Sequence, residues 1–167
     1  TLIHEPGRLN ARIEGHRIIT SVLQRMPALR RRYRHFLPFF PTLIERFDFS
    51  GYDLVISSSH CVAKSVIVPA GTVHVCYCHS PMRYAWDQFD AYFGPGRLRP
   101  LGTCVMRPIM AGLARWDRDT AGRVDRYVAI SHHVADRIGR YYNREASVVY
   151  PPVDTVFFHP DGSDPER

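Results

Sequence analysis

The chain has 167 residues, of which 45% are hydrophobic, and its 22 Lys and Arg against 16 Asp and Glu give a formal net charge of +6. This length suits one domain with its own core, and the hydrophobic fraction excludes a mainly disordered chain. No stretch approaches the roughly 18 apolar residues of a membrane span, and the first residues are polar, so we expect neither a membrane-spanning segment nor a signal peptide.

Five apolar, strand-like runs alternate with helical patterns along the chain. The runs lie at residues 17–22 (RIITSV), 52–56, 73–78, 126–130 and 147–150. Apolar residues at spacings of three and four predict a helix over 106–116 and another after Ser131, which is a good N-cap residue. Strands that alternate with helices predict an α/β fold with right-handed crossovers and a parallel sheet covered on both faces.

The charge is unevenly distributed among residue types, since Lys64 is the only lysine. Arginine forks suit phosphates and carboxylates, so we expect a phosphorylated ligand or an anionic surface as a partner. Cysteines stand at Cys61, Cys76, Cys78 and Cys104, without the spacing of a disulfide scaffold. We therefore expect reduced, mostly buried thiols in a cytoplasmic protein.

Polar side chains follow three of the predicted strands. Ser59 and His60 follow the run at 52–56, His79 follows 73–78, and Ser131 follows 126–130. Ligands of open parallel sheets bind outside the carboxyl ends of the strands, which predicts a site at this edge. Helix capping explains the serines as well, but histidine is not a preferred cap, so His60 and His79 are the stronger candidates for ligand contact.

Several catalytic and metal motifs are absent or weak. No GxGxxG, GxxxxGK[ST] or GxSxG occurs, which leaves dinucleotide enzymes, P-loop enzymes and elbow-type hydrolases without support. His74, Cys76 and Cys78 share one strand face, but their spacing differs from that of common zinc sites, and buried thiols are the preferred interpretation. Asp87 and Asp90 are neighbours on one predicted helix turn and do not face each other as glycosidase carboxylates do.

A basic run precedes an aromatic segment at residues 36–40. Its members are Arg30, Arg31, Arg32 and Arg34. The pattern suits either a solvated helix end whose aromatics enter the core or contact with an anionic membrane surface. Nucleic-acid phosphate is the least favoured partner, and we expect no nucleic-acid binding.

Four stretches resemble the amino-terminal half of glycosyltransferase family 4. They are GYDLVISSSHCVAKSV, VHVCYCHSPMRYAWDQFDAYFG, WDRDTAGRVDRYVAISHHVADRI and VVYPPVDTVFFHP. CHSPMRYAWD is the most specific part, and the resemblance runs over residues 1–160. It is strongest to bacterial enzymes of the mannosyltransferase type that build polysaccharides and O-antigens.

The resemblance implies the amino-terminal domain of a GT-B glycosyltransferase, a Rossmann-like parallel sheet flanked by helices that lacks its first strand. Residues 1–150 would form this acceptor-side domain, and 151–167 would begin the linker to a donor-binding domain that is missing here. The implied activity is retaining, metal-independent transfer of a hexose, mannose first, from GDP-mannose or a UDP-sugar. The acceptor would be a polysaccharide or lipid-linked glycan.

The resemblance implies no cofactor and a cytoplasmic location, peripheral on the inner face of the cell membrane. The piece alone would be inactive without the donor domain. The alternative is a non-catalytic module that binds sugar or membrane.

The resemblance also assigns site residues. His79 corresponds to the histidine of the family's strand–His–x–Pro motif, which lies near the transferred sugar, and it is the candidate catalytic residue. Substrate-binding positions are expected at the strand ends and after that motif: Ser59, His60, Arg83, Tyr84, Trp86, Asp87 and Ser131.

Overall fold

The computed structural model describes residues 1–25, 33–94, 96–97 and 99–158. Its strands are β1 (Leu54–Ser59), β2 (Val73–Cys78), β3 (Arg126–Ala129) and β4 (Ala146–Val148). Its α-helices are α1 (Ala11–Glu14), α3 (Phe40–Ile44), α4 (Arg83–Trp86), α5 (Phe89–Phe93), α6 (Pro100–Asp119) and α7 (His132–Tyr142). Short 3₁₀ helices span Val22–Arg25, Tyr33–Phe39, Ala63–Ser65 and Thr120–Arg123.

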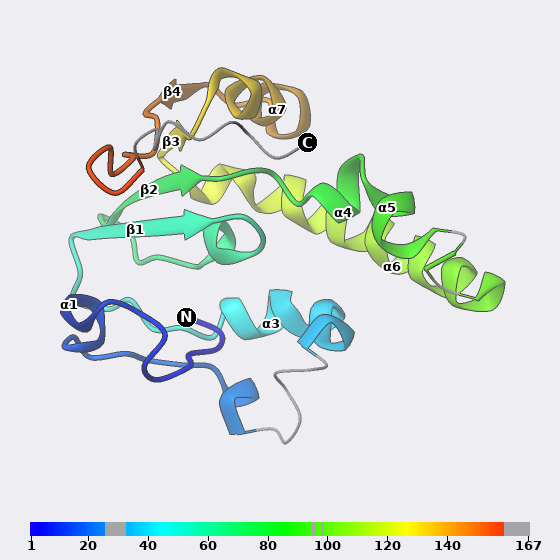
Figure 1. Ribbon diagram of the computed structural model, residues 1–167, viewed down its shortest axis with the longest axis horizontal. Helices are drawn as coiled ribbons and strands as arrows, with labels where there is room; N and C mark the ends of the chain where they lie inside the picture. The colour runs from blue at the N-terminus through cyan, green and yellow to red at the C-terminus, as the bar shows by residue number, and fades with distance from the viewer. Residues whose placement is uncertain (26–32, 95, 98, 159–167) are drawn as a thin grey trace.

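The four strands form one parallel sheet in the order β1-β2-β3-β4. Ser59 pairs with Cys78, and Cys78 pairs with Ala129, so the carboxyl ends of three strands meet at one edge. The arrowheads of β1 and β2 point toward the side of the molecule where α4, α5 and α6 lie (Figure 1). The predicted parallel α/β fold is confirmed, with a Rossmann-like sheet and flanking helices.

Helices cover one face of this sheet. A first cluster of buried residues joins α3, α6 and β1 and includes Phe40, Val55 and Met110. A second cluster packs α7 against β2 and β3 and includes Ala129 and Ile138. Both clusters depend on alternation along the strands, because successive side chains of a strand point to opposite faces.

The other face of the sheet is exposed, so the prediction of cover on both faces is wrong for the described part of the chain. Leu54, Ile56 and Val73 point away from the core and are 50%, 67% and 47% exposed. The burial of β1 alternates strictly along its length. A parallel sheet buried on both faces has near-continuous burial along its strands instead.

The predicted strand at 17–22 is also wrong. Residues 17–21 are irregular, and a 3₁₀ helix begins at Val22. The segment contacts the start of the chain, where the Ser21 N–H donates to the Leu2 carbonyl at 3.2 Å. Ile19 and Val22 are 48% and 62% exposed. These β-branched side chains therefore have no buried surface against which a strand could be stabilised.

The other predicted elements are present, β2 with the predicted ends and the remaining strands with shifted ends. β1 begins two residues later than predicted and continues to Ser59, and α6 extends the predicted 106–116 helix at both ends. All four cysteines are free, with Cys76 and Cys78 buried and Cys104 exposed. Within the described ranges, no helix combines the length and apolar character needed to cross a bilayer.

Candidate functional site

His79 lies one residue beyond β2, at the edge where β1, β2 and β3 end. Its backbone N–H donates to the Ser59 carbonyl at 2.8 Å, which continues the β1–β2 pairing by one residue. Its ring Nε2 lies 2.8 Å from the Ser58 hydroxyl, and the ring meets Tyr77 edge-on at 5.4 Å between centroids. The side chain is exposed, so an oriented imidazole faces solvent at this edge.

His60 and Arg83 lie at the same end of the sheet as this imidazole. His60 follows β1 directly, and the register of the two strands places it opposite His79. Arg83 begins α4, four residues after His79. Partial desolvation of its ring, followed by charge interactions with His79 and Arg83, lowers the pKa of His60, so its neutral form is favoured at pH 7. Both side chains are exposed.

Ser59 does not lie at the surface, and Ser58 takes that place. The Ser59 side chain is 2% exposed, and its hydroxyl accepts from the Lys64 N–H at 3.2 Å. Because strand side chains alternate, the neighbouring Ser58 points outward and contacts His79. Ser58 was not among the predicted site residues. Its exposure follows from the alternation of side chains along a strand that continues to residue 59.

Tyr84 and Trp86 make contacts within the domain. The Tyr84 hydroxyl lies 2.6 Å from the Cys61 sulfur, and burial raises the pKa of this thiol to about 11, which keeps it protonated at neutral pH. The Trp86 indole N–H donates to an Asp117 carboxylate oxygen at 2.8 Å. Its ring stacks on Tyr141 with 4.6 Å between centroids, so α4 is held against α6 and α7.

Asp87 is held by α7. Arg137 donates two hydrogen bonds to its carboxylate, one of them at 3.0 Å, and the Tyr141 hydroxyl donates a third at 3.2 Å. The hydrogen bonds from Arg137 hold the pKa of Asp87 below its ordinary value. Asp90 lies in a separate helix, α5, and pairs with Arg107 at 3.5 Å. Asp87 thus joins α4 to α7, and its oxygens are already occupied.

Ser131 caps a helix, which is the simpler of the two roles expected from its position after a strand. It is the N-cap of α7, and its hydroxyl accepts from the Val134 N–H at 3.3 Å. The C-terminal end of the same helix closes on Asn143, which adopts a left-handed conformation with φ of 52°. These caps fix the helix that holds Asp87.

A buried ionic network lies behind the site. The Lys64 ammonium is 3.1 Å from Asp117 Oδ1, and the two side chains are 1% and 0% exposed. Asp117 Oδ2 accepts from the Trp86 N–H and from the Tyr142 hydroxyl, each at 2.8 Å. Lys64 is the only lysine of the sequence, but no local pattern pairs it with a carboxylate 53 residues away.

His74 is a hydrogen-bonded core histidine. Its Nε2 lies 2.8 Å from the Ser57 hydroxyl, and its Nδ1 lies 2.9 Å from the Arg123 carbonyl. Burial lowers its pKa. Across the residues that the structure describes, no group of three or more His, Cys, Asp or Glu is placed to hold a metal ion.

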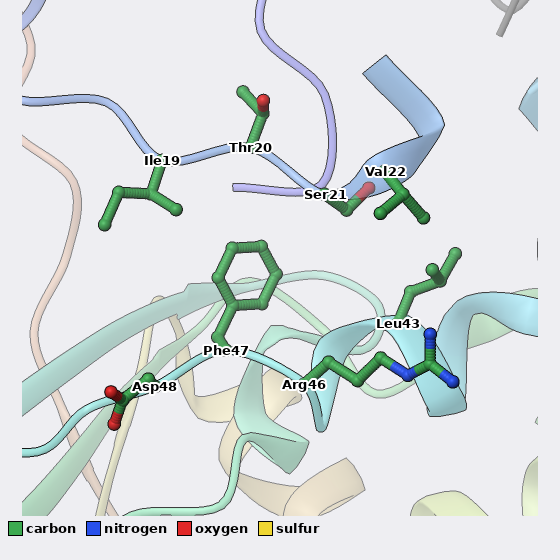
Figure 2. A pocket seen from close by; sticks show the side chains of 8 residues that line it. All are labelled: Ile19, Thr20, Ser21, Val22, Leu43, Arg46, Phe47 and Asp48. Atoms are coloured by element: carbon green, nitrogen blue, oxygen red, sulfur yellow. The ribbon is translucent and has the colours of Figure 1, made fainter. Parts of the chain in front are cut away.

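A pocket of about 300 Å³ lies away from the strand ends, between residues 19–22 and the end of α3. In Figure 2 the apolar side chains of Ile19 and Val22 face Leu43 and Phe47 across the pocket, with Arg46 and Asp48 at opposite ends. None of the predicted site residues lines it.

The basic run is mostly outside the described residues. The structure does not describe Arg30, Arg31 and Arg32, nor the side chain of Arg34. In the segment that follows, Phe40 is buried and Phe39 is 60% exposed. Part of this aromatic segment therefore enters the core.

The comparisons with known proteins agree with the fold. The family model described as Glycosyltransferase Family 4 matches residues 3–157. No curated protein and no solved structure matches the chain. The match covers nearly the whole length and includes the sheet edge that carries His79. The chain belongs to glycosyltransferase family 4.

Proposed function

We propose that this domain serves a retaining, metal-independent hexosyltransferase. The enzyme moves a hexose, mannose first, from a nucleotide sugar to a polysaccharide or lipid-linked acceptor. Family membership supports transferase activity in general. The observation that carries the proposal is the exposed His79 imidazole, fixed by Ser58 at the carboxyl edge of a parallel sheet.

Sugar transfer requires polar groups that are held in fixed orientations around the reacting atoms. Transfer breaks the bond between the anomeric carbon and the diphosphate oxygen and forms a bond from that carbon to an acceptor hydroxyl oxygen, whose proton passes to the departing diphosphate. Positive charge develops on the sugar and negative charge on the diphosphate, so fixed dipoles and cations accelerate the step. His79 suits this task because Ser58 occupies Nε2 and leaves Nδ1 for a sugar hydroxyl.

The other candidate residues divide into three groups. The exposed side chains of His60 and Arg83 stand beside His79, and we propose that they contact substrate. Tyr84 and Trp86 are half-buried and position α4, from which Arg83 projects. The remaining candidates, Ser59, Asp87 and Ser131, act through the backbone and through α7 to hold the edge in shape.

Sugar transfer by the full-length protein tests the proposal. The protein is incubated with GDP-mannose or UDP-sugars and with membrane lipid extract, and release of nucleoside diphosphate is measured together with labelled glycan. We expect turnover that EDTA does not reduce and a product whose anomeric configuration matches the donor. Sugar binding without turnover for any donor would contradict the proposal and favour a non-catalytic binding module.

We also propose that the enzyme acts at the cytoplasmic face of the membrane, with the basic run as its contact. The residues are Arg30, Arg31, Arg32 and Arg34. Arginine near an anionic bilayer contributes about 1 kcal/mol per side chain. Replacing all four with glutamine should abolish flotation with phosphatidylglycerol vesicles. Unchanged flotation would remove this part of the proposal.

A further inference from the structure

Two histidines and an arginine gather at the carboxyl ends of β1 and β2: His60, His79 and Arg83. His60 and His79 occupy facing positions one residue beyond the two strands, which in a sheet lie about 4.8 Å apart. Arg83 is close enough for its charge to act on His60. None of the three forms an ion pair within the described part of the chain.

Arg83 differs in this respect from three arginines of the domain that do pair with carboxylates. Arg123 pairs with Glu45 at 2.6 Å, Arg137 with Asp87, and Arg107 with Asp90 at 3.5 Å. Asp87 is the carboxylate nearest to Arg83 along the chain, and Arg137 and Tyr141 occupy its oxygens. Among the described residues, no carboxylate therefore forms an ion pair with this cluster.

We propose that His60, His79 and Arg83 form a binding site for a phosphate group. The carrier is either the diphosphate of the nucleotide sugar or the phosphate of a lipid-linked acceptor, and this choice of carriers rests on the proposed function. The phosphate site itself rests only on the cluster. It lies on the acceptor-side domain, where the proposed reaction brings both carriers together.

The three side chains have complementary roles in this site. The Arg83 guanidinium offers a fork of N–H donors that matches phosphate oxygens. His79 is fixed by its hydrogen bond to Ser58, with Nδ1 left for a ligand. His60 is held toward its neutral form by partial desolvation and by charge interactions with His79 and Arg83. A bound phosphate brings the opposite charge, so His60 takes up a proton as the anion binds.

Binding of inorganic pyrophosphate to the full-length protein tests the inference, read through the histidine ring signals in NMR spectra. We expect pyrophosphate to shift the His60 and His79 signals and to raise the pKa of His60. Arg83→Gln should weaken binding at least about tenfold, since a charge-assisted hydrogen bond is lost. The matched control is Arg126→Gln, an exposed arginine at the opposite edge of the sheet, which should bind like the unmodified protein.

Two results would overturn the inference. One is the absence of any histidine shift up to millimolar pyrophosphate, and the other is equal weakening by Arg83→Gln and Arg126→Gln, which would show diffuse attraction to a basic protein. Competition separates the carriers: displacement by GDP or UDP identifies the donor diphosphate, and displacement by a short prenyl phosphate identifies the acceptor. Sugar transfer that persists without pyrophosphate binding would refute this site and leave the proposed function standing.

Discussion

Replacing Lys64 with methionine should destabilise the domain strongly. The Lys64 ammonium lies within reach of four oxygens: Asp117 Oδ1 at 3.1 Å, the Asp117 carbonyl at 2.6 Å, Ser65 Oγ at 3.1 Å and Thr120 Oγ1 at 3.3 Å. Methionine preserves the buried stem and removes the charge. Asp117, which is 0% exposed, would then keep a carboxylate with no cation beside it.

The expected loss follows from that burial. Breaking one half of a buried ion pair costs about 3–5 kcal/mol, a large share of the 5–15 kcal/mol that stabilise a typical domain. Urea unfolding followed by tryptophan fluorescence suits the measurement, because the Trp86 indole donates to Asp117. Arg126→Met is the surface control and should change the free energy of unfolding by less than about 0.5 kcal/mol.

A second variant separates charge from packing. Lys64→Met combined with Asp117→Asn removes the stranded charge while keeping an amide oxygen for Trp86 and Tyr142. We expect it to recover about 1–3 kcal/mol relative to Lys64→Met alone. A loss below about 1 kcal/mol for Lys64→Met, or no recovery in the double variant, would refute the ionic reasoning. The comparison remains possible if the single variant fails to fold, because recovery of folding is then the readout.

Two further predictions concern the supports of the site. Asp87→Asn should lower the free energy of unfolding by about 1–3 kcal/mol, because Arg137, whose side chain is 9% exposed, loses its charged partner. Arg137 depresses the pKa of Asp87, so this stabilisation is complete well above the ordinary value of 3.8 and is lost as the pH falls below it. The curves of stability against pH for the variant and the unmodified protein should therefore converge only in strong acid. A difference in stability that vanishes already at pH 6 would contradict this. Ser131→Ala should cost about 1 kcal/mol in thermal unfolding, while Ser131→Asn, another good cap, should cost little; equal losses would argue against capping.

Local pattern predicted those elements whose burial agrees with their composition. The run at 73–78 becomes β2 with the predicted ends, because Gly71 permits a turn at φ of 90° before it and Cys76 and Cys78 are buried in the cluster that includes α7. The run at 17–22 has the same β-branched character but no neighbouring strand, and it stays irregular. Propensity alone does not distinguish the two, because strand formation depends on a partner.

The sequence predicted which loop carries polar side chains after β1, but not which of the serines is exposed. The sequence placed Ser59 and His60 after a strand, whereas the structure extends β1 through Ser59, and the pleat turns Ser59 inward and Ser58 outward. Which of two adjacent serines faces solvent depends on the phase of the strand, and that phase is set by distant packing partners. The Lys64–Asp117 and Asp87–Arg137 pairs also join segments far apart in sequence, so no local spacing reveals them.

The most direct test of the account is sugar transfer by His79→Ala in the full-length protein. The imidazole is exposed, and among the described residues its hydrogen bond is to Ser58 and its ring contact is with Tyr77, so the fold should survive its removal. Loss of one contact to the developing charge should lower kcat at least about 100-fold, while His16→Ala, which changes an exposed histidine near α1, should leave it unchanged. Near-normal turnover by a folded His79→Ala variant would contradict the assignment of this sheet edge as the sugar site.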